Sequence, residues 1–207
     1  MNWNLTGKMD EKRRSPGLAQ LNDLTVIVAG GTGAAKVPLN STEIWDPNTG
    51  EWKLIAQMNT ARDSMSYVLL PDGRFMVIGG KSIDKKGVLI SSIKECEIYD
   101  PQTGKWEEAA PMNEKRVNHT ATLLNDGNVL VMGGGKEDGP YLKTVELYDP
   151  RRDIWIQLAP MSVGRAMHTT TKLIDGRILV VGGRGKKTST EIYDPRSKTW
   201  TSSGNTD

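Results

Sequence analysis

The chain lacks the features that mark secreted, membrane and nucleic-acid-binding proteins. Its single cysteine, Cys96, cannot form an intrachain disulfide, which permits a reducing compartment such as the cytoplasm. The apolar runs, for example Thr25–Ala29 and Ile178–Val181, are far too short to span a bilayer. The first residues, Met1–Asn4, have no signal-peptide pattern. We therefore expect a cytoplasmic protein that does not act at a membrane.

Net charge and aromatic content are also low. The 207 residues carry a net charge of +2, which argues against a general binder of nucleic acid or of membranes. Aromatic residues make up only 6% of the chain. Six of them are tryptophans, beside five tyrosines and one phenylalanine, and the tryptophans are placed regularly.

One unit occurs four times in the sequence. Each unit has an Asp-Pro pair and a tryptophan six residues after the aspartate, and the units follow at intervals of 45 to 54 residues. A fixed period of this length indicates an array of one supersecondary unit, here a single domain over residues 1–207. The four instances are Asp46-Pro47 with Trp52, Asp100-Pro101 with Trp106, Asp149-Pro150 with Trp155, and Asp194-Pro195 with Trp200.

Other residues keep constant spacings within the unit. Every unit has a double glycine, an arginine 17 residues before it, a methionine four residues before the arginine, and a glutamate nine residues before the tryptophan. All differences in length lie between the second glycine and the glutamate, so insertions fall in one loop per unit. The residues are Gly30-Gly31, Gly79-Gly80, Gly133-Gly134 and Gly182-Gly183; Arg13, Arg62, Arg116 and Arg165; Met9, Met58, Met112 and Met161; and Glu43, Glu97, Glu146 and Glu191.

The third unit shows the strands that we expect. Thr120–Leu124 is a short β-prone run that ends at an Asn-Asp-Gly turn signal. Val129–Met132 is a continuous apolar run, typical of a strand buried on both faces, and it stops at Gly133-Gly134. Thr144–Tyr148 and Trp155–Leu158 follow as the third and fourth strands, joined by the Asp-Pro turn. Each unit thus predicts four consecutive antiparallel strands.

The unit resembles the kelch repeat, over nearly the whole chain. The double glycine after the second strand, the tyrosine before Asp-Pro and the tryptophan carry the resemblance. It implies an all-β, kelch-type β-propeller array of four four-stranded antiparallel blades. The blade units it implies are approximately residues 13–56, 62–110, 116–159 and 165–203.

The number of blades in the working ring stays open. Trp3 precedes Met9 by six residues, as each repeat tryptophan precedes its methionine, so Asn2–Thr6 predicts an extra outer strand within residues 1–9. That strand could close a small four-bladed ring by displacing Thr199–Ser203. The chain could instead be an incomplete piece of a larger propeller, since kelch rings usually have five to seven blades. Two chains could also pair as a homodimer through open blade edges.

The loops between strands two and three share one face of such a propeller with the connections between blades. They contain nine basic and three acidic residues, a charge of +6 in a chain of +2. A rigid scaffold with a basic, variable loop face favours an acidic protein segment as partner, although charged loops can also be merely solvated. We therefore expect a non-catalytic scaffold that binds a protein and no nucleic acid. The candidate contacts are Lys81, Lys85, Lys86, Lys136, Arg184, Lys186 and Lys187.

Similarity to kelch propellers that capture acidic peptides adds the blade-start arginines Arg62, Arg116 and Arg165 as candidate ligand contacts. Because an arginine and a glutamate occur in every unit, the alternative is a structural Arg–Glu pair that ties each blade together.

Two histidines, His119 and His168, each follow a repeat arginine by three residues and are candidates for the central channel. They could share a ligand or metal there, or be packed and hydrogen-bonded. Two imidazoles without nearby acids or thiolates make a poor zinc site, so we predict no metal and no cofactor. No catalytic motif stands out, so we predict no catalytic residue. The alternative function is a carbohydrate-active or metal-dependent propeller enzyme, epimerase- or oxidase-like, that uses the channel.

Overall fold

The computed structural model describes residues 6–84, 86–135, 139–185 and 188–205. Within these residues the chain forms sixteen strands in four antiparallel sheets, and the strands of each sheet lie side by side in chain order. The sheets, called blades 1 to 4, confirm the predicted all-β class with four-stranded antiparallel blades. This part of the chain contains no helix that is long and apolar enough to cross a membrane.

The strand bounds lie close to those predicted from the repeat. Blade 1 has β1 (Gly17–Gln20), β2 (Val26–Ala29), β3 (Thr42–Trp45) and β4 (Trp52–Leu54). Blade 2 has β5 (Ser66–Leu69), β6 (Phe75–Ile83), β7 (Leu89–Asp100) and β8 (Lys105–Ala109). Blade 3 has β9 (Thr120–Leu123), β10 (Val129–Met132), β11 (Val145–Asp149) and β12 (Ile154–Leu158). Blade 4 has β13 (Thr169–Lys172), β14 (Ile178–Val181), β15 (Ser189–Asp194) and β16 (Thr199–Asn205).

The Asp-Pro and tryptophan motif builds the outer part of each blade. In blade 4 the Asp194 carboxylate accepts a hydrogen bond from the amide of Arg196 at 2.8 Å, which fixes the turn. Trp200 lies opposite Tyr193, with ring centroids 5.0 Å apart. The Trp200 indole N–H donates to the carbonyl of Ala159, just after the outer strand of blade 3, at 2.9 Å. The motif therefore shapes one blade and attaches it to the blade before.

The double glycines lie where consecutive blades meet. The N–H of the second glycine donates to the carbonyl of the next blade's arginine, as Gly80 does to Arg116 at 2.9 Å. The first glycine, Gly79, has a φ of +58°, and a Cβ on it would stand 2.8 Å from the same carbonyl oxygen. Glycine is required here because a side chain would collide with the backbone of the neighbouring blade.

The hydrophobic core lies between the blades. In the described residues, three buried clusters occupy the three junctions between neighbouring blades. Along β10, Val129 and Val131 belong to the cluster shared with blade 2. The alternate residues, Leu130 and Met132, belong to the cluster shared with blade 4. This double burial explains why the second strand is apolar throughout.

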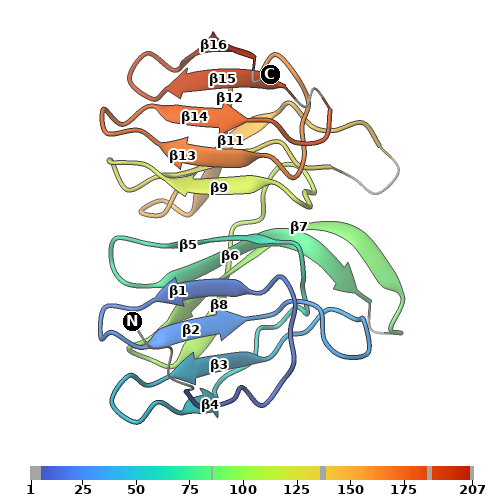
Figure 1. The fold of residues 1–207 in the computed structure, drawn as a ribbon, viewed down its shortest axis with the longest axis vertical. Coiled ribbons are helices and arrows are strands. Elements are labelled where there is room, and N and C mark those ends of the chain that lie inside the picture. The colour runs from blue at the N-terminus through green and yellow to red at the C-terminus, as the bar shows by residue number, and fades with distance from the viewer. Residues whose placement is uncertain (1–5, 85, 136–138, 186–187, 206–207) are drawn as a thin grey trace.

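The blades form an open arc, with blade 1 at the bottom and blade 4 at the top of Figure 1. The innermost strands β1, β5, β9 and β13 contact one another in that order. Gly183 and Arg13, which would form a fourth junction, are not bonded to each other. The four described blades therefore do not close into a four-bladed ring.

The outer position of blade 4 is taken by β16, which pairs with β15, so Thr199–Ser203 is not displaced. Thr6 and Gly7 lie at the β3–β4 turn of blade 1, where the Thr6 hydroxyl and the Gly7 amide both donate to the Gly50 carbonyl. Residues 6–9 form no strand, and Trp3, on which the prediction of an extra outer strand rests, lies outside the described residues.

Blade 2 differs from the prediction in its second loop. Lys81–Ile93 was expected to be a loop, but β6 and β7 continue through most of it as a hairpin. The hairpin turns at Asp84, whose carboxylate accepts hydrogen bonds from the amides of Lys86 and Val88, each at 2.8 Å. An insertion of this length can satisfy its backbone groups by pairing with itself.

Replacing Gly79 by alanine should cost more stability than replacing Gly104. Both glycines have positive φ, so alanine carries a backbone strain of about 1 kcal/mol at either position. A Cβ at Gly104 meets no atom of the described residues within 4 Å, unlike one at Gly79. We expect Gly79→Ala to lower the free energy of unfolding by about 1–3 kcal/mol more than Gly104→Ala, measured by urea denaturation. Equal losses would show that the close contact between blades is not what requires glycine.

Candidate functional site

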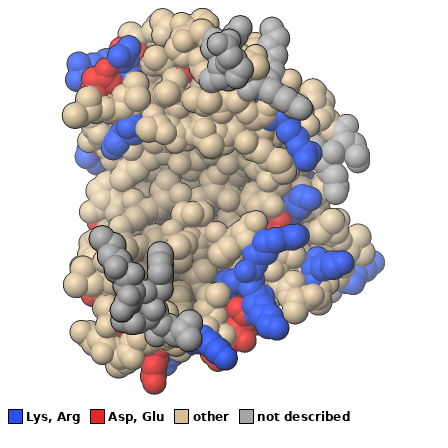
Figure 2. Space-filling model, in the orientation of Figure 1, with Lys and Arg blue, Asp and Glu red and all other residues tan. Residues whose placement is uncertain are grey.

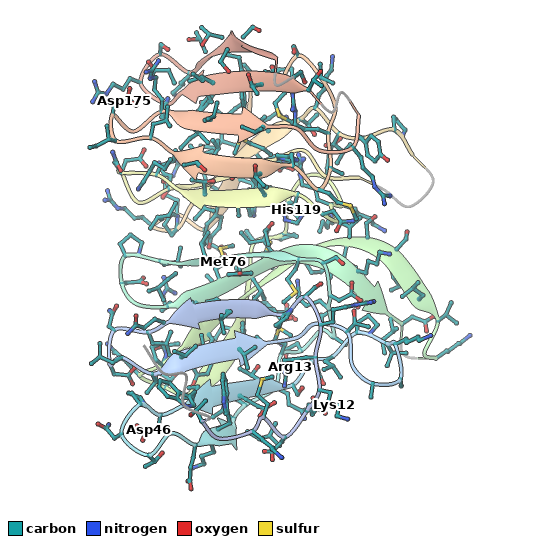
Figure 3. All side chains as sticks on the ribbon, in the orientation of Figure 1. Lys12, Arg13, Asp46, Met76, His119 and Asp175 are labelled. Carbon is teal, nitrogen blue, oxygen red and sulfur yellow. The ribbon has the colours of Figure 1, made fainter. Side chains whose placement is uncertain are left out.

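The two ends of the blades carry different kinds of residue (Figure 3). The tight turns lie at one end, where Asp46 and Asp175 are seen on the left. Lys12, Arg13 and His119 lie toward the opposite end. That end, called the loop face, consists of the described residues of the four loops between second and third strands, together with residues 10–16, 59–65, 113–119 and 162–168.

The repeat arginines lie inside their blades. Arg62, Arg116 and Arg165 have 0% exposed surface. Each donates to the carboxylate of the glutamate in its own third strand: Arg62 to Glu97 at 2.6 Å, Arg116 to Glu146 at 2.9 Å, and Arg165 to Glu191 at 2.8 Å. This arrangement is the structural Arg–Glu pair. It leaves these three side chains no surface to offer a ligand, because the folded blade encloses them.

Each arginine also satisfies backbone groups that the strands leave unpaired. The Arg116 guanidinium donates to the carbonyls of Gly133 at 2.7 Å and Thr144 at 3.1 Å. Its partner Glu146 accepts from the amide of Asn113 at 2.7 Å, in the segment that enters the blade. One compensated pair of buried charges thus joins three segments of the blade.

The two histidines occupy separate junctions. The His119 ring packs against Gly79 of blade 2, and the His168 ring packs against Gly133 of blade 3. His168 Nε2 is 3.0 Å from the Thr120 hydroxyl. Among the described residues, no three side chains of the metal-binding types are placed to hold an ion together. Both rings are therefore packed between blades and border the channel mouth, but among the described residues only the His168 ring has a hydrogen-bond partner, so the expected hydrogen bond is missing for His119.

The channel mouth contains strained residues that the sequence did not reveal. Ser15, Ser64, Asn118 and Met167 take equivalent positions, two residues after the repeat arginines, with φ between 52° and 55°. The Asn118 amide donates to the Ser64 carbonyl at 3.1 Å, and the Met167 amide donates to the Asn118 carbonyl at 2.9 Å. With the histidines they line a hollow of about 270 Å³. Their side chains are two serines, an asparagine and a methionine, so no residue type common to all four units marked them.

Basic side chains lie along the loop face, on the right of Figure 2. Lys81 and Arg184 line one hollow there, and neither makes an ion pair with a described residue. Lys86 is exposed at the tip of the β6–β7 hairpin. The other predicted contacts, Lys85, Lys136, Lys186 and Lys187, lie outside the described residues. A second group of basic residues, Lys12, Arg14 and Lys36, lines a hollow of about 310 Å³. Of these three, only Lys36 was counted from the sequence, as a loop residue.

Stability should fall as the pH drops below about 6.5. Burial lowers the pKa of His119 to about 3 and that of His168 to about 4, and the nearby Arg116 and Arg165 add to the effect. Between pH 6.5 and about 5, the unfolded chain binds protons that the folded chain excludes. The free energy of unfolding should therefore fall by up to about 1.4 kcal/mol per pH unit for each histidine.

Urea denaturation across this pH range measures the slope. A His119→Gln/His168→Gln variant should flatten it, because the amides do not titrate. An unchanged slope in the variant would assign the acid sensitivity to other groups.

Comparisons with known proteins agree with the repeat and the blades. A family model described as the KLHDC2/KLHL20/DRC7 Kelch-repeats domain matches residues 17–206. The F-box/kelch-repeat protein At1g80440 of Arabidopsis thaliana is 31% identical over 140 residues, which cover 64% of this chain and 38% of the relative. Kelch-like protein 33 of Homo sapiens is 33% identical over 131 residues, which cover 62% of this chain and 23% of the relative. The chain thus spans well under half the length of these relatives.

The solved structure of YjhT has the same fold. It superposes with a TM-score of 0.76 at 18% identity, over 94% of this chain and 66% of that one. At this identity the likeness concerns the fold alone. The family model covers most of the chain, and the double glycines, the Asp-Pro turns and the tryptophans all take the places that the blades require. The chain belongs to the kelch-repeat family of β-propellers.

Proposed function

We propose that the chain is a non-catalytic kelch-repeat scaffold that binds an acidic segment of a protein partner through its loop face. The contrast between paired and unpaired cations carries the proposal. The repeat arginines are buried in ion pairs with glutamates. Lys81 and Arg184 lie on the loop face without an ion pair to any described residue. Unpaired cations on a rigid surface attract carboxylates and speed their encounter.

The distribution of variable residues supports the same surface. The blades repeat the same strands and junctions, whereas the loops between second and third strands differ in length and sequence. Binding residues are expected on variable loops that a rigid scaffold positions. The relatives are named as F-box/kelch-repeat and Kelch-like proteins, which favours a role in protein interaction. They are much longer than this chain, so their own partners are not carried over.

The alternative of a propeller enzyme finds less support. His119 and His168 are 6% and 5% exposed, and their pKa values are depressed by burial. Burial also raises the pKa of the Cys96 thiol to about 12, which does not suit a nucleophile. These side chains therefore favour the binding function over the enzymatic one.

A homodimer through the open flanks stays a prediction, as does the cytoplasmic location. Leu18 and Ile174 are 49% and 107% exposed. Their counterparts in other blades contact a neighbouring blade: Ala121 packs in the junction with blade 2, and Asn22 and Asn125 approach the turn glycines of the next blades. If two chains pair in this way, light scattering should give twice the chain mass of 22.8 kDa. A mass of one chain at high concentration would contradict the homodimer.

Selection from a displayed library of random peptides tests the acidic partner. We expect the enriched peptides to be rich in aspartate and glutamate and to bind less tightly as salt rises. A variant with Lys81, Lys85, Lys86, Lys186 and Lys187 changed to glutamate should lose at least about tenfold in affinity.

The matched control changes Arg151, Arg196 and Lys198 to glutamate, at the tight-turn end, and should bind like the original chain. Enriched peptides without an acidic excess would refute the proposal. So would unchanged binding by the loop variant.

A further inference from the structure

We infer that the loop face contains a subsite for one carboxylate side chain, in the hollow between Lys81 of blade 2 and Arg184 of blade 4. The hollow has a volume of about 230 Å³, and Tyr141 and Met167 are among its lining residues. The inference rests on the proposed binding of an acidic segment, and it places one acid of that segment.

The hollow exists because blade 3 has a glycine at the position where blades 2 and 4 have a long basic side chain. In each blade, the residue after the double glycine forms an antiparallel bridge with the residue after the repeat arginine. The bridged pairs are Thr32 with Arg14, Lys81 with Asp63, Gly135 with Val117, and Arg184 with Ala166. Gly135 has no side chain and Val117 is 4% exposed. Blade 3 therefore leaves open the space that Lys81 and Arg184 flank.

Both cations project from fixed backbone. The Lys81 amide donates to the Asp63 carbonyl at 2.8 Å, and the Arg184 amide donates to the Ala166 carbonyl at 2.7 Å. Asp63, the bridge partner of Lys81, is already engaged, because its carboxylate accepts the hydroxyls of Thr32 at 3.1 Å and Ser64 at 2.7 Å. The backbone under both cations is thus held in place, and neither cation forms an ion pair with a described residue, so both charges can interact with an anion.

The lining selects the chemistry of the ligand. A guanidinium binds a planar carboxylate through two parallel hydrogen bonds, and an ammonium on the other side adds a second positive charge. Tyr141 and Met167 are 40% and 53% exposed, and they offer an aromatic and a thioether surface beside the cations. The side-chain amide of Asn118, which is also in the lining, suits a hydrogen bond to a peptide backbone. The matching ligand is an acidic residue next to an apolar one.

An acid built into the hollow tests the subsite without a partner. Gly135 has no positive φ, and among the described residues a Cβ on it would meet only Tyr141, at an ordinary 3.6 Å. We expect Gly135→Glu to have a folding equilibrium constant about three- to tenfold higher than Gly135→Gln at low salt. The advantage should disappear in a Lys81→Met/Arg184→Met background and persist in a Lys86→Met/Arg196→Met control. No advantage of glutamate over glutamine, or the same advantage in both backgrounds, overturns the inference.

A double-mutant cycle with a selected acidic peptide tests the subsite even if the Gly135 variants fold poorly. Each acid of the peptide is changed to its amide in turn. At one position the change should cost about tenfold or more in affinity for the original chain and little for Lys81→Met/Arg184→Met. Equal losses at every acid would overturn the subsite and leave the proposed function standing. Stabilisation by Gly135→Glu without any selected acidic peptide would support the subsite and refute the acidic partner.

Discussion

In blades 2 to 4 the repeat arginine uses its side chain and its backbone for different contacts. The Arg116 guanidinium pairs with Glu146 and binds carbonyls at the ends of the second and third strands of blade 3. The Arg116 carbonyl accepts the N–H of Gly80 in blade 2. The residue therefore holds its own blade together and also attaches it to the one before. The buried charge of Arg116 is tolerated because its Nε, Nη1 and Nη2 atoms all have partners, and removing Glu146 would cost several kcal/mol, about 3–5 in comparable cases.

These contacts of the repeat arginine determine which positions of a blade can vary. The arginine and the two glycines cannot change without disturbing a junction, but the residues that follow them differ from blade to blade. The bridges between these following residues place one variable pair per blade on the loop face, at equivalent positions. The backbone of such a site is set by the repeat, and its chemistry is set by four independent choices of side chain. A scaffold of this kind separates stability from recognition.

The sequence was sufficient for the parts of the fold that are repeated. The run Val129–Met132 was predicted as a strand buried on both faces, and β10 lies there with its alternate residues in two junction clusters. The occurrence of an arginine and a glutamate in every unit also led to the Arg–Glu pair, as one of two interpretations. The β6–β7 hairpin was not predicted, because the insertion occurs once and its charged residues gave no strand pattern. The contacts of His119 and His168 depend on glycines of neighbouring blades, which spacing within one unit does not show.

The sequence predicted only part of the candidate site, for a related reason. Counting charges over the loops pointed to the loop face, but it gave Lys86, at a hairpin tip, the same weight as Lys81, which lines a hollow. What distinguishes Lys81 is the glycine at the equivalent position of the next blade and the arginine at the one after. The hollow between three blades arises because their side chains differ at one position. A glycine at that position in a single blade forms no recognisable motif in the sequence. Four identical blades would place identical cations around the mouth, and their mutual repulsion would favour no single position for an acid. The departure from the repeat in blade 3 removes that symmetry, and the proposed subsite depends on it.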